Sequence, residues 1–325
     1  MVKPTVISTF AGCGGSSLGY QMAGFHELLA VEWDQNAVDT FRLNFPDVPV
    51  YHGDIAKLTG AECMRLAGIE KGILDVLDGS PPCQGFSTAG KRKWYDPRNS
   101  LFKEYALLLN ELQPKVFVIE NVTGMVKGCM KQAYLTIIKT LRECGYKAKG
   151  EVLNAMYFNV PQSRERVIII GVRNDLGIEP THPKPQTRPV MAGEAIRGVV
   201  NDAEELRWLI ESGLKYVTYQ SWPDMPIGTS RQDLGLSSGF SCKKWDPRKP
   251  AKTVGKHDGH ITMHGPMHWA ERRRFTVAEF KRFSSFPDSF QFTGGYKAVE
   301  RIGNSVPPNL MRAIAEHIRK EILHV

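Results

Sequence analysis

The chain has 325 residues, of which 42% are hydrophobic and 23% charged, so it can bury a full core and has an ordinary globular composition. Its formal net charge of +8 suits a polyanionic partner. The sequence has no run of about 18 apolar residues and starts directly with a strand pattern, so we expect neither a membrane span nor a secretory signal. Its six cysteines form no Cys-x-x-Cys pair, which favours reduced thiols in the cytoplasm over a disulfide framework.

Short apolar runs alternate with helical patterns through roughly the first 170 residues, which is typical of βαβ units. We therefore predict an α/β fold with a mostly parallel sheet and helices on both faces. The predicted strands are Val6–Phe10, Leu28–Glu32, Val50–Tyr51, Leu74–Leu77, Val116–Glu120 and Val167–Val172, and the predicted helices include Asn36–Asn44, Leu101–Leu112 and Ala133–Cys144.

The second half of the chain is different in texture. Prolines crowd between residues 180 and 189, and the sequence then stays irregular and rich in Gly, Pro, Ser and His, with one predicted helix near Ala203–Leu214. Helical order returns at Val277–Phe283 and at Pro308–Leu323, whose apolar stripe needs a core to cover. We expect a small inserted domain over residues 179–271, within a larger discontinuous domain of residues 1–178 and 272–325.

A glycine-rich segment, Phe10-Ala-Gly-Cys-Gly-Gly-Ser-Ser-Leu-Gly, follows the first predicted strand and opens a helix. Gly12, Gly14 and Gly15 allow a tight turn and a close approach to a ligand, and the helix N-terminus offers unpaired N–H groups. A structural turn or a dinucleotide site would have a similar pattern. The segment by itself leaves these alternatives open.

Two further segments follow the next strands. The second strand ends in Glu32-Trp33, where a carboxylate suits ribose hydroxyls and an indole suits an adenine ring. Asp54-Ile55 follows the third strand, where a carboxylate can accept a hydrogen bond from an adenine amino group. Together with the glycine-rich segment, they predict an adenosyl cofactor that has no pyrophosphate.

Chemically active residue types stand at the ends of later strands. Gly79-Ser-Pro-Pro-Cys-Gln-Gly-Phe-Ser places Cys83 after the fourth strand, where it is either a nucleophile or a small buried hydrophobe. Glu120 closes the fifth strand, and a charged residue there is rarely a packing choice. In Pro161-Gln-Ser-Arg-Glu-Arg-Val, we predict that Gln162, Arg164 and Arg166 project from one face of a strand.

In chain order, these segments resemble the motif series of the DNA cytosine-5 methyltransferases of bacterial or phage type. The match continues with Asn99-Ser-Leu-Phe, Arg273-Arg-Phe-Thr-Val-Ala-Glu, Phe286-Pro-Asp and Gly303-Asn-Ser-Val-Pro-Pro, and spares only about Thr181–Trp269. In one departure, Ser8-Thr9 stands where the family often has an acidic residue and Leu before Phe-x-Gly, and we expect at most a modest effect on cofactor contacts. The resemblance implies a Rossmann-like methyltransferase sheet with an irregular target-recognition domain at residues 179–271.

The resemblance also implies the reaction. S-adenosylmethionine would give its methyl group to carbon 5 of a flipped-out cytosine in a specific double-stranded DNA sequence, leaving S-adenosylhomocysteine. Cys83 would add to carbon 6 as the nucleophile, and Glu120 would hydrogen-bond ring N3. Arg164 would orient Glu120 and contact the base carbonyl, and Arg166 would support this arrangement.

Cofactor and DNA contacts follow from the same resemblance. The expected cofactor contacts are Phe10, Gly12, Gly14, Gly15, Leu18, Glu32, Trp33, Asp54, Ile55, Pro82, Leu101, Asn304, Ser305 and Val306. The basic stretch around Lys91 and the stretch from Lys243 to Lys256, each with an interleaved Trp, are expected to engage DNA. The expected DNA contacts are Gln84, Ser87, Lys91, Arg92, Arg98, Gln162, Arg231, Gln232, Lys243, Lys244, Thr253 and Lys256.

Several alternatives remain. A transfer-RNA cytosine-5 methyltransferase would share the fold and catalytic motifs, although its Cys-Phe-Thr signature is not found in the insert. The glycine-rich segment also permits a nicotinamide-dependent enzyme, and a non-catalytic DNA-binding regulator would keep the fold. Four closely spaced histidines, His257, His260, His264 and His268, lack a familiar ligand spacing, so we expect no metal.

The expected partner is double-stranded DNA, with no membrane involved. A cognate restriction endonuclease acting separately is left open, and we expect the chain to be a monomer. It would act in the cytoplasm of a prokaryotic cell or of a phage-infected host.

Overall fold

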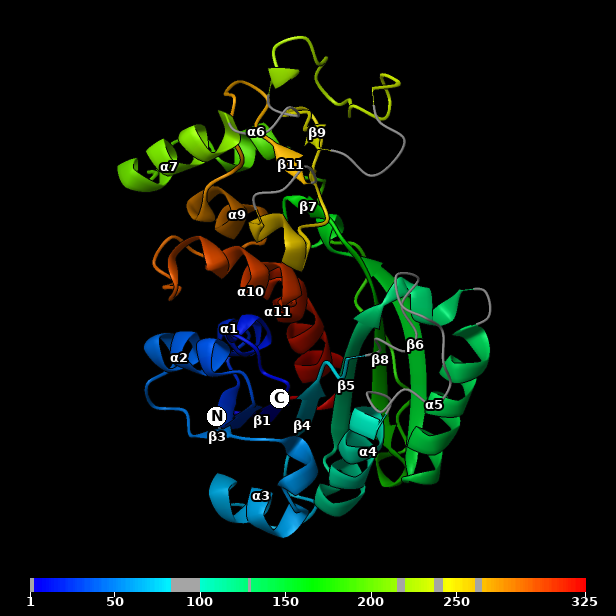
Figure 1. Ribbon diagram of the computed structural model, residues 1–325. Helices are drawn as coiled ribbons and strands as arrows, with labels where there is room; N and C mark the ends of the chain where they lie inside the picture. Colours follow the sequence, from blue (N-terminus) through cyan, green and yellow to red (C-terminus); the bar gives the residue numbers. More distant parts are fainter. Residues whose placement is uncertain (1–2, 83–99, 128–129, 215–219, 237–241, 261–264) are drawn as a thin grey trace. The chain divides into compact units, whose positions relative to one another are not determined.

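The computed structural model describes the chain except for residues 1–2, 83–99, 128–129, 215–219, 237–241 and 261–264 (Figure 1). It divides into two compact units. Unit 1 comprises Met1–Asn154, Glu165–Pro185 and Pro308–Val325, and unit 2 comprises Ala155–Arg164 and Gln186–Pro307. These contact-based units place residues 272–307 outside the larger unit, whereas the predicted functional division, at residues 179 and 272, remains a prediction.

Unit 1 is built on a seven-stranded sheet with the order β3-β2-β1-β4-β5-β8-β6. Adjacent strands from β3 to β5 run parallel, and β8 and β6 add antiparallel pairs. The α/β prediction is therefore confirmed. Because the chain leaves β1 toward β2 and β3 and returns to β4 on the other side, the topological switch point lies between β1 and β4. The strands are β1 (Thr5–Thr9), β2 (His26–Glu32), β3 (Val50–His52), β4 (Val76–Gly79), β5 (Val116–Val122), β6 (Tyr146–Asn154) and β8 (Glu165–Arg173).

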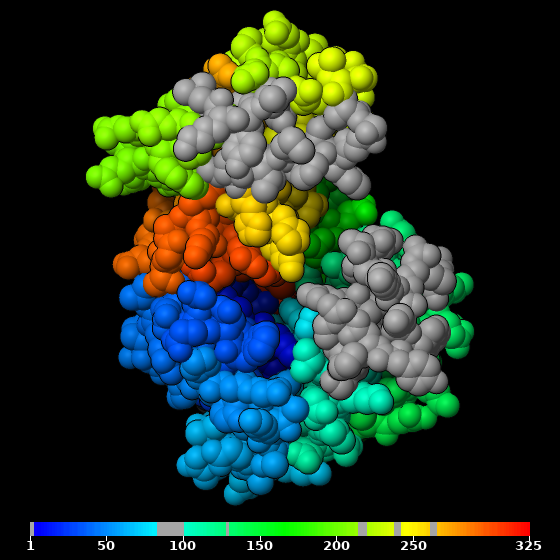
Figure 2. All heavy atoms as spheres, in the orientation of Figure 1, coloured from blue at the N-terminus to red at the C-terminus, as the bar shows by residue number. Residues whose placement is uncertain are grey.

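Helices cover this sheet on its two faces. Alternate strand residues such as Ile7 and Phe117 share one hydrophobic core with α3, α4 and α5. On the other face, α1 packs against α11 so closely that a Cβ on Gly19 would lie 2.6 Å from the Met311 Cβ (Figure 1). Helices α3 and α4 lie side by side (Figure 2). The helices of this unit are α1 (Gly15–Met22), α2 (Gln35–Asn44), α3 (Gly60–Ala67), α4 (Ser100–Leu112), α5 (Lys131–Glu143) and α11 (Pro308–His317), followed by the π-helical turn Ile318–Ile322.

The six predicted strands all form, within two residues of their expected bounds at either end. Strand β6 and helix α3 were not predicted. In β6, the exposed or half-buried Lys147 and Lys149 alternate with the buried Tyr146 and Ala148, because β6 is the outermost strand and pairs only with β8 in this sheet.

The predicted single strand through Gln162 and Arg166 is wrong. β7 (Gln162–Ser163) pairs in parallel with β10 (Ala251–Lys252) in unit 2, and β8 starts only at Glu165. Between them, the Arg164 N–H donates to the Gln162 carbonyl oxygen at 3.0 Å, which bends the chain. The three side chains therefore do not share one strand face.

Unit 2 has little regular structure. It contains the pair β7 and β10, the pair β9 (Lys243–Lys244) and β11 (Pro266–Met267), and a core in which Trp245 packs on Phe275 and Phe283 with ring centroids 5.0 and 5.6 Å away. Its helices are α6 (Ala192–Ala195), α7 (Ala203–Leu214), α9 (Val277–Phe283) and α10 (Ala298–Asn304). None of the helices in the described part of the chain is long and apolar enough to cross a membrane.

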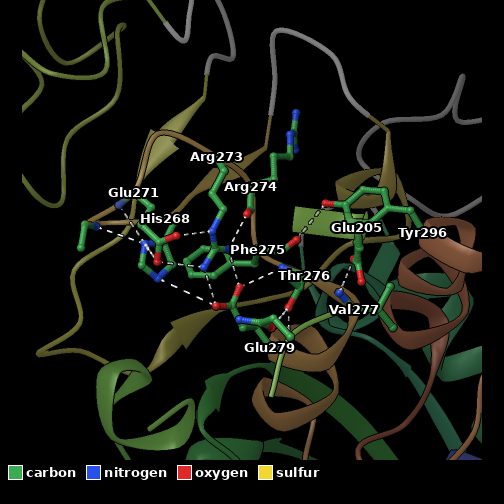
Figure 3. A network of polar contacts seen from close by, with 12 residues as sticks. Glu205, His268, Glu271, Arg273, Arg274, Phe275, Thr276, Val277, Glu279 and Tyr296 are labelled. Atoms are coloured by element: carbon green, nitrogen blue, oxygen red, sulfur yellow. Dashed lines mark hydrogen bonds and ion pairs between the residues drawn. The ribbon is translucent and has the colours of Figure 1, made fainter. Parts of the chain in front are cut away.

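A buried ionic network fixes the start of α9 (Figure 3). The Arg273 guanidinium donates to both carboxylate oxygens of Glu279, at 2.8 and 2.9 Å, and the two side chains are each 2% exposed. Glu279 also accepts from the N–H of Thr276, whose hydroxyl caps the helix in return. Burial lowers the pKa of the adjacent His268 to about 4, so it stays neutral at physiological pH. The contacts between Arg273, Thr276 and Glu279 thus stabilise the start of α9.

Candidate active site

The glycine-rich loop forms at the carboxyl end of β1. Phe10, Gly12 and Gly14 all have positive φ angles, of 55°, 57° and 93°. A Cβ on Gly12 would meet nothing within 4 Å, whereas one on Gly14 would lie 2.4 Å from the Phe45 ring. Gly14 is therefore required by packing, and Gly12 leaves open space at the loop. Gly15 and Leu18 follow in the first turns of α1.

Glu32 ties this loop to the end of β2. One of its carboxylate oxygens accepts the Gly12 N–H at 2.8 Å, and the other accepts the N–H groups of Trp33 and Asp34, both at 2.9 Å. The side chain is buried, so these three hydrogen bonds orient it firmly. The sequence linked Glu32 to the glycine loop only because both segments suit one ligand. In the structure the two segments are connected directly by the hydrogen bond from the Gly12 N–H to the Glu32 carboxylate.

Trp33 and Asp54 stand beside Glu32 at the ends of β2 and β3. The Trp33 residue is 76% exposed, which is unusual for so large an aromatic side chain and leaves its ring free to stack. The Gly53 N–H donates to the Glu32 carbonyl oxygen at 3.0 Å, and the Asp54 carboxylate caps a short 3₁₀ helix that begins with the buried Ile55. An open glycine turn, an oriented carboxylate and an exposed indole fit an adenosyl group.

Glu120 is the predicted acid at the end of β5. Its carboxylate makes an ion pair with the Arg166 guanidinium at 2.8 Å, and both side chains are mostly buried. Arg166 lies opposite Val122 in the antiparallel pair of β5 and β8, which sets this contact. Arg166, expected only to support the site, therefore holds Glu120 itself.

Asn121 is a further candidate at the end of β5 that the sequence motifs did not single out. Its side-chain amide donates to the Pro81 carbonyl oxygen at 3.0 Å, and its oxygen accepts the Val122 N–H at 2.9 Å. It thereby ties the end of β5 to the segment that leads into Cys83. A second polar residue directly after Glu120 was the available signal. Of the predicted cofactor contacts in this region, Pro82 directly follows Pro81, and Leu101 lies in the first turn of α4.

Among the described residues, the remaining candidates for catalysis and for cofactor contacts lie in unit 2. Arg164 is 3% exposed and donates to the Val254 carbonyl oxygen at 3.0 Å. Asn304 ends α10, and Ser305 and Val306 follow it, with the Ser305 hydroxyl donating to the Arg301 carbonyl oxygen. A Cβ on the preceding Gly303 would lie 2.5 Å from the Gly255 backbone, so this position has no room for a side chain.

Two residues that are predicted to contact DNA have internal partners in the structure. Lys244 is 7% exposed, its ammonium donates to the carbonyl oxygens of Trp222 and Met225, and it lies 3.8 Å from the Trp222 ring centroid. Gln162 is fully buried and hydrogen-bonded through both ends of its amide, to Ser284 and to the Val254 N–H among others. Both side chains are committed to internal contacts, because each completes the hydrogen bonding of neighbouring backbone.

The other residues of unit 2 that are predicted to contact DNA are exposed or half-buried. Lys243 is 3.6 Å from Asp233, and Arg231 donates to the Ser221 hydroxyl and the Leu236 carbonyl oxygen. The Thr253 hydroxyl donates to the Ser163 carbonyl oxygen. Gln232 is exposed and Lys256 is half-buried.

Cys83 and part of the predicted DNA surface lie outside the described residues. The same holds for Gln84, Ser87, Lys91, Arg92 and Arg98.

The doubly wound sheet, with a glycine loop at one strand end and a paired acid at another, is the Rossmann-like arrangement in which methyltransferases and other nucleotide-binding enzymes are built. The model of the C-5 cytosine-specific DNA methylase family matches residues 4–320. The chain belongs to this family, and its activity is methylation of DNA cytosine at carbon 5. The family's enzymes depend on S-adenosylmethionine, and the transfer-RNA alternative has less support.

Individual relatives cover nearly the whole chain. Type II methyltransferase M1.HphI of Haemophilus parahaemolyticus is 38% identical over 97% of this chain and 87% of its own length. Type II methyltransferase M.XorII of Xanthomonas oryzae pv. oryzae is 34% identical over 99% and 86%. The crystal structure of S. pombe Dnmt2 methyltransferase shares the fold, with a TM-score of 0.69 and 18% identity over 98% of this chain and 99% of that one.

Proposed function

We propose that Cys83 is the nucleophile of this reaction and that Glu120, held by Arg166, is the group that pairs with the target base. The Glu120–Arg166 ion pair at 2.8 Å carries the proposal, because it orients a carboxylate at the carboxyl edge of the sheet. Asn121 supports it by tying the same strand end to Pro81, two residues before Cys83.

The chemistry requires these groups. The Cys83 thiolate adds to carbon 6 of cytosine, which forms a carbon–sulfur bond and makes carbon 5 nucleophilic. Glu120 and ring N3 share a proton in a hydrogen bond, which offsets the negative charge that develops at N3. After carbon 5 has gained the methyl group, loss of its proton lets Cys83 leave and restores the ring double bond. Arg164 is proposed to contact the base carbonyl.

The cofactor site is proposed at the ends of β1, β2 and β3. When bound, S-adenosylmethionine supplies the electrophilic methyl group. Glu32 would accept hydrogen bonds from ribose hydroxyls, Trp33 would stack on the adenine, and Asp54 would accept from its amino group. The glycine loop and Pro82 would border the cofactor, and so would Leu101 and the segment Asn304–Val306.

Residues 179–271 are proposed to recognise a specific sequence of double-stranded DNA. Lys243 and Lys256 would contact phosphates and Thr253 the DNA backbone, whereas Arg231 and Gln232 would contact base edges. Residues 85–98 would close over the flipped base. Two relatives carry the name Type II methyltransferase, which supports the proposal that this chain acts alongside a separate restriction endonuclease.

Covalent trapping tests the nucleophile. DNA carrying 5-fluorocytosine should form a denaturation-resistant adduct at Cys83, because fluorine cannot leave as the proton does. Cys83→Ala should abolish the adduct and methylation while DNA binding persists. Cys144→Ala is the matched control, since this half-buried thiol has its pKa raised by burial and should leave trapping intact. An adduct that persists in Cys83→Ala would contradict the proposal.

The substrate and the reading domain are tested with methylation assays. Duplex DNA should be methylated and transfer RNA should not, and the reverse result would favour the alternative. Grafting a relative's residues over 179–271 should change which cytosine is methylated in a randomised duplex library. If the preferred sequence is unchanged, recognition does not reside in the insert.

A further inference from the structure

A buried carboxylate stands at the switch point of the sheet without a role in the proposed reaction. Asp78, the next-to-last residue of β4, is 2% exposed, and its Cα partners are Ser8 on β1 and Val118 on β5. It precedes Cys83 by five residues and lies at the strand end where this fold places ligands. Because burying a carboxylate is costly, such a residue needs a reason to be there.

Asp78 is bound by the helix that follows the glycine loop. The Tyr20 hydroxyl donates to its carboxylate at 3.3 Å, and the Ser16 hydroxyl, in the first turn of α1, is also hydrogen-bonded to it. The Asp78 carbonyl oxygen accepts from the Thr9 hydroxyl at the end of β1 at 2.9 Å. One residue therefore links β4 to both ends of the glycine loop.

The surroundings of Asp78 are acidic. The titratable groups that face it from neighbouring elements are Tyr20 of α1, Tyr105 of α4, Glu27 of β2 and Glu120 of β5. None of these described neighbours is a cation. Burial raises the pKa of Asp78 to about 8 and that of Glu27 to about 7, so the pair retains protons near neutral pH.

Ser8 is the residue of β1 that lies opposite Asp78. It stands two residues before Phe10, where the glycine loop starts. Ser8 is fully buried and is the Cα partner of Asp78 in the parallel pair of β1 and β4. Side chains at such partner positions project from the same face of adjacent strands.

We propose that Asp78 is a positioning residue for the cofactor, which acts from β4 on the adjacent glycine loop. It acts through Ser16 and Tyr20, which hold the start of α1 and thereby the glycine loop in place. The inference rests on the proposed cofactor site at that loop.

Transposing the carboxylate tests the inference. Asp78→Ser should weaken binding of both S-adenosylmethionine and S-adenosylhomocysteine about tenfold, measured by calorimetry. The double variant Ser8→Asp/Asp78→Ser returns the carboxylate from the other strand and should restore affinity to within about threefold. Ser8→Asp alone should lower the unfolding temperature, because it adds a third carboxylate beside Asp78 and Glu27. If the Asp78 side chain only filled space, moving the carboxylate to position 8 would not restore the affinity for the cofactor.

Two further variants guard the result. Asp75→Asn is the matched control, since Asp75 precedes the same strand at its amino end, where it binds Thr5 and Lys115. It should lower thermal stability and leave affinity unchanged. Asp78→Asn, nearly isosteric, keeps the test valid if Asp78→Ser does not fold. At pH 9, where Asp78 is ionised, it should also weaken binding about tenfold, because it leaves one acceptor oxygen for the hydroxyls of Ser16 and Tyr20.

The outcomes separate the two levels of inference. Normal affinity in folded Asp78→Ser and Asp78→Asn, or no rescue by a folded double variant, overturns the role of Asp78. If Glu32→Gln and Trp33→Ala bind normally as well, the proposed cofactor site itself is wrong.

Discussion

Glu32→Gln is expected to weaken cofactor binding by disturbing the glycine loop as well as the ribose contact. The Glu32 carboxylate accepts three backbone N–H groups, from Gly12 on one oxygen and from Trp33 and Asp34 on the other. A glutamine has one acceptor oxygen and one amide group. If its oxygen keeps the bonds to Trp33 and Asp34, its NH₂ faces the Gly12 N–H, donor against donor.

The size of the effect follows from this count. One hydrogen bond to a charged acceptor is lost, which costs about 1.5–3 kcal/mol. If the cofactor must restore the loop when it binds, that cost corresponds to a roughly 10- to 150-fold weaker affinity. Because the Glu32 carboxylate and most of the loop are buried, Glu32→Gln should also lower the unfolding temperature.

Calorimetry with S-adenosylmethionine and S-adenosylhomocysteine measures the effect, and both ligands should lose affinity alike. Asp34→Asn is the control, because the Asp34 carboxylate caps α2 through the Ala37 N–H and does not contact Gly12. It should change stability by about 1 kcal/mol or less, with affinity retained. Unchanged affinity in Glu32→Gln would refute the argument that this carboxylate positions the loop.

Three other predictions follow from buried charges and from the different exposure of Lys243 and Lys244. Glu279→Ala leaves the exposed carboxylate of Glu271 as the ion-pair partner of the buried Arg273 guanidinium, so it should lower the free energy of unfolding by about 3 kcal/mol in urea denaturation, the low end of the cost of breaking a buried pair. Lys243→Ala should weaken binding to all DNA sequences and reduce the salt dependence by a slope of roughly one, whereas Lys244→Ala should mainly destabilise the protein; equal effects on DNA binding would contradict the burial argument. Asp78 has a raised pKa in the folded state, so the folded chain holds a proton that the unfolded chain has already released, and stability should fall as pH rises from about 5 to 8. Thermal unfolding across this range should show a shallower fall in Asp78→Asn, and an identical slope would contradict the assignment.

Much of unit 1 could be predicted from local patterns. The parallel strands are continuous apolar runs because helices cover both faces of the sheet, and this pattern survives without any knowledge of the partners. Ordered motifs identified the candidate chemistry in the same way, since each stands at the end of a strand. The outer strand β6 escaped prediction because its exposed face carries charged side chains such as Lys149.

The sequence by itself determined the family, the reaction and the candidate residues, because these depend on residue types in a fixed order along the chain. Tertiary structure alone decided which atoms meet. The ion pair of Glu120 with Arg166 depends on the antiparallel register of β5 and β8, and the commitment of Lys244 to internal carbonyl groups depends on how a loop folds over it. Spacing along the chain carries no information about such contacts, because strand register and burial are set by packing between segments that lie far apart in sequence.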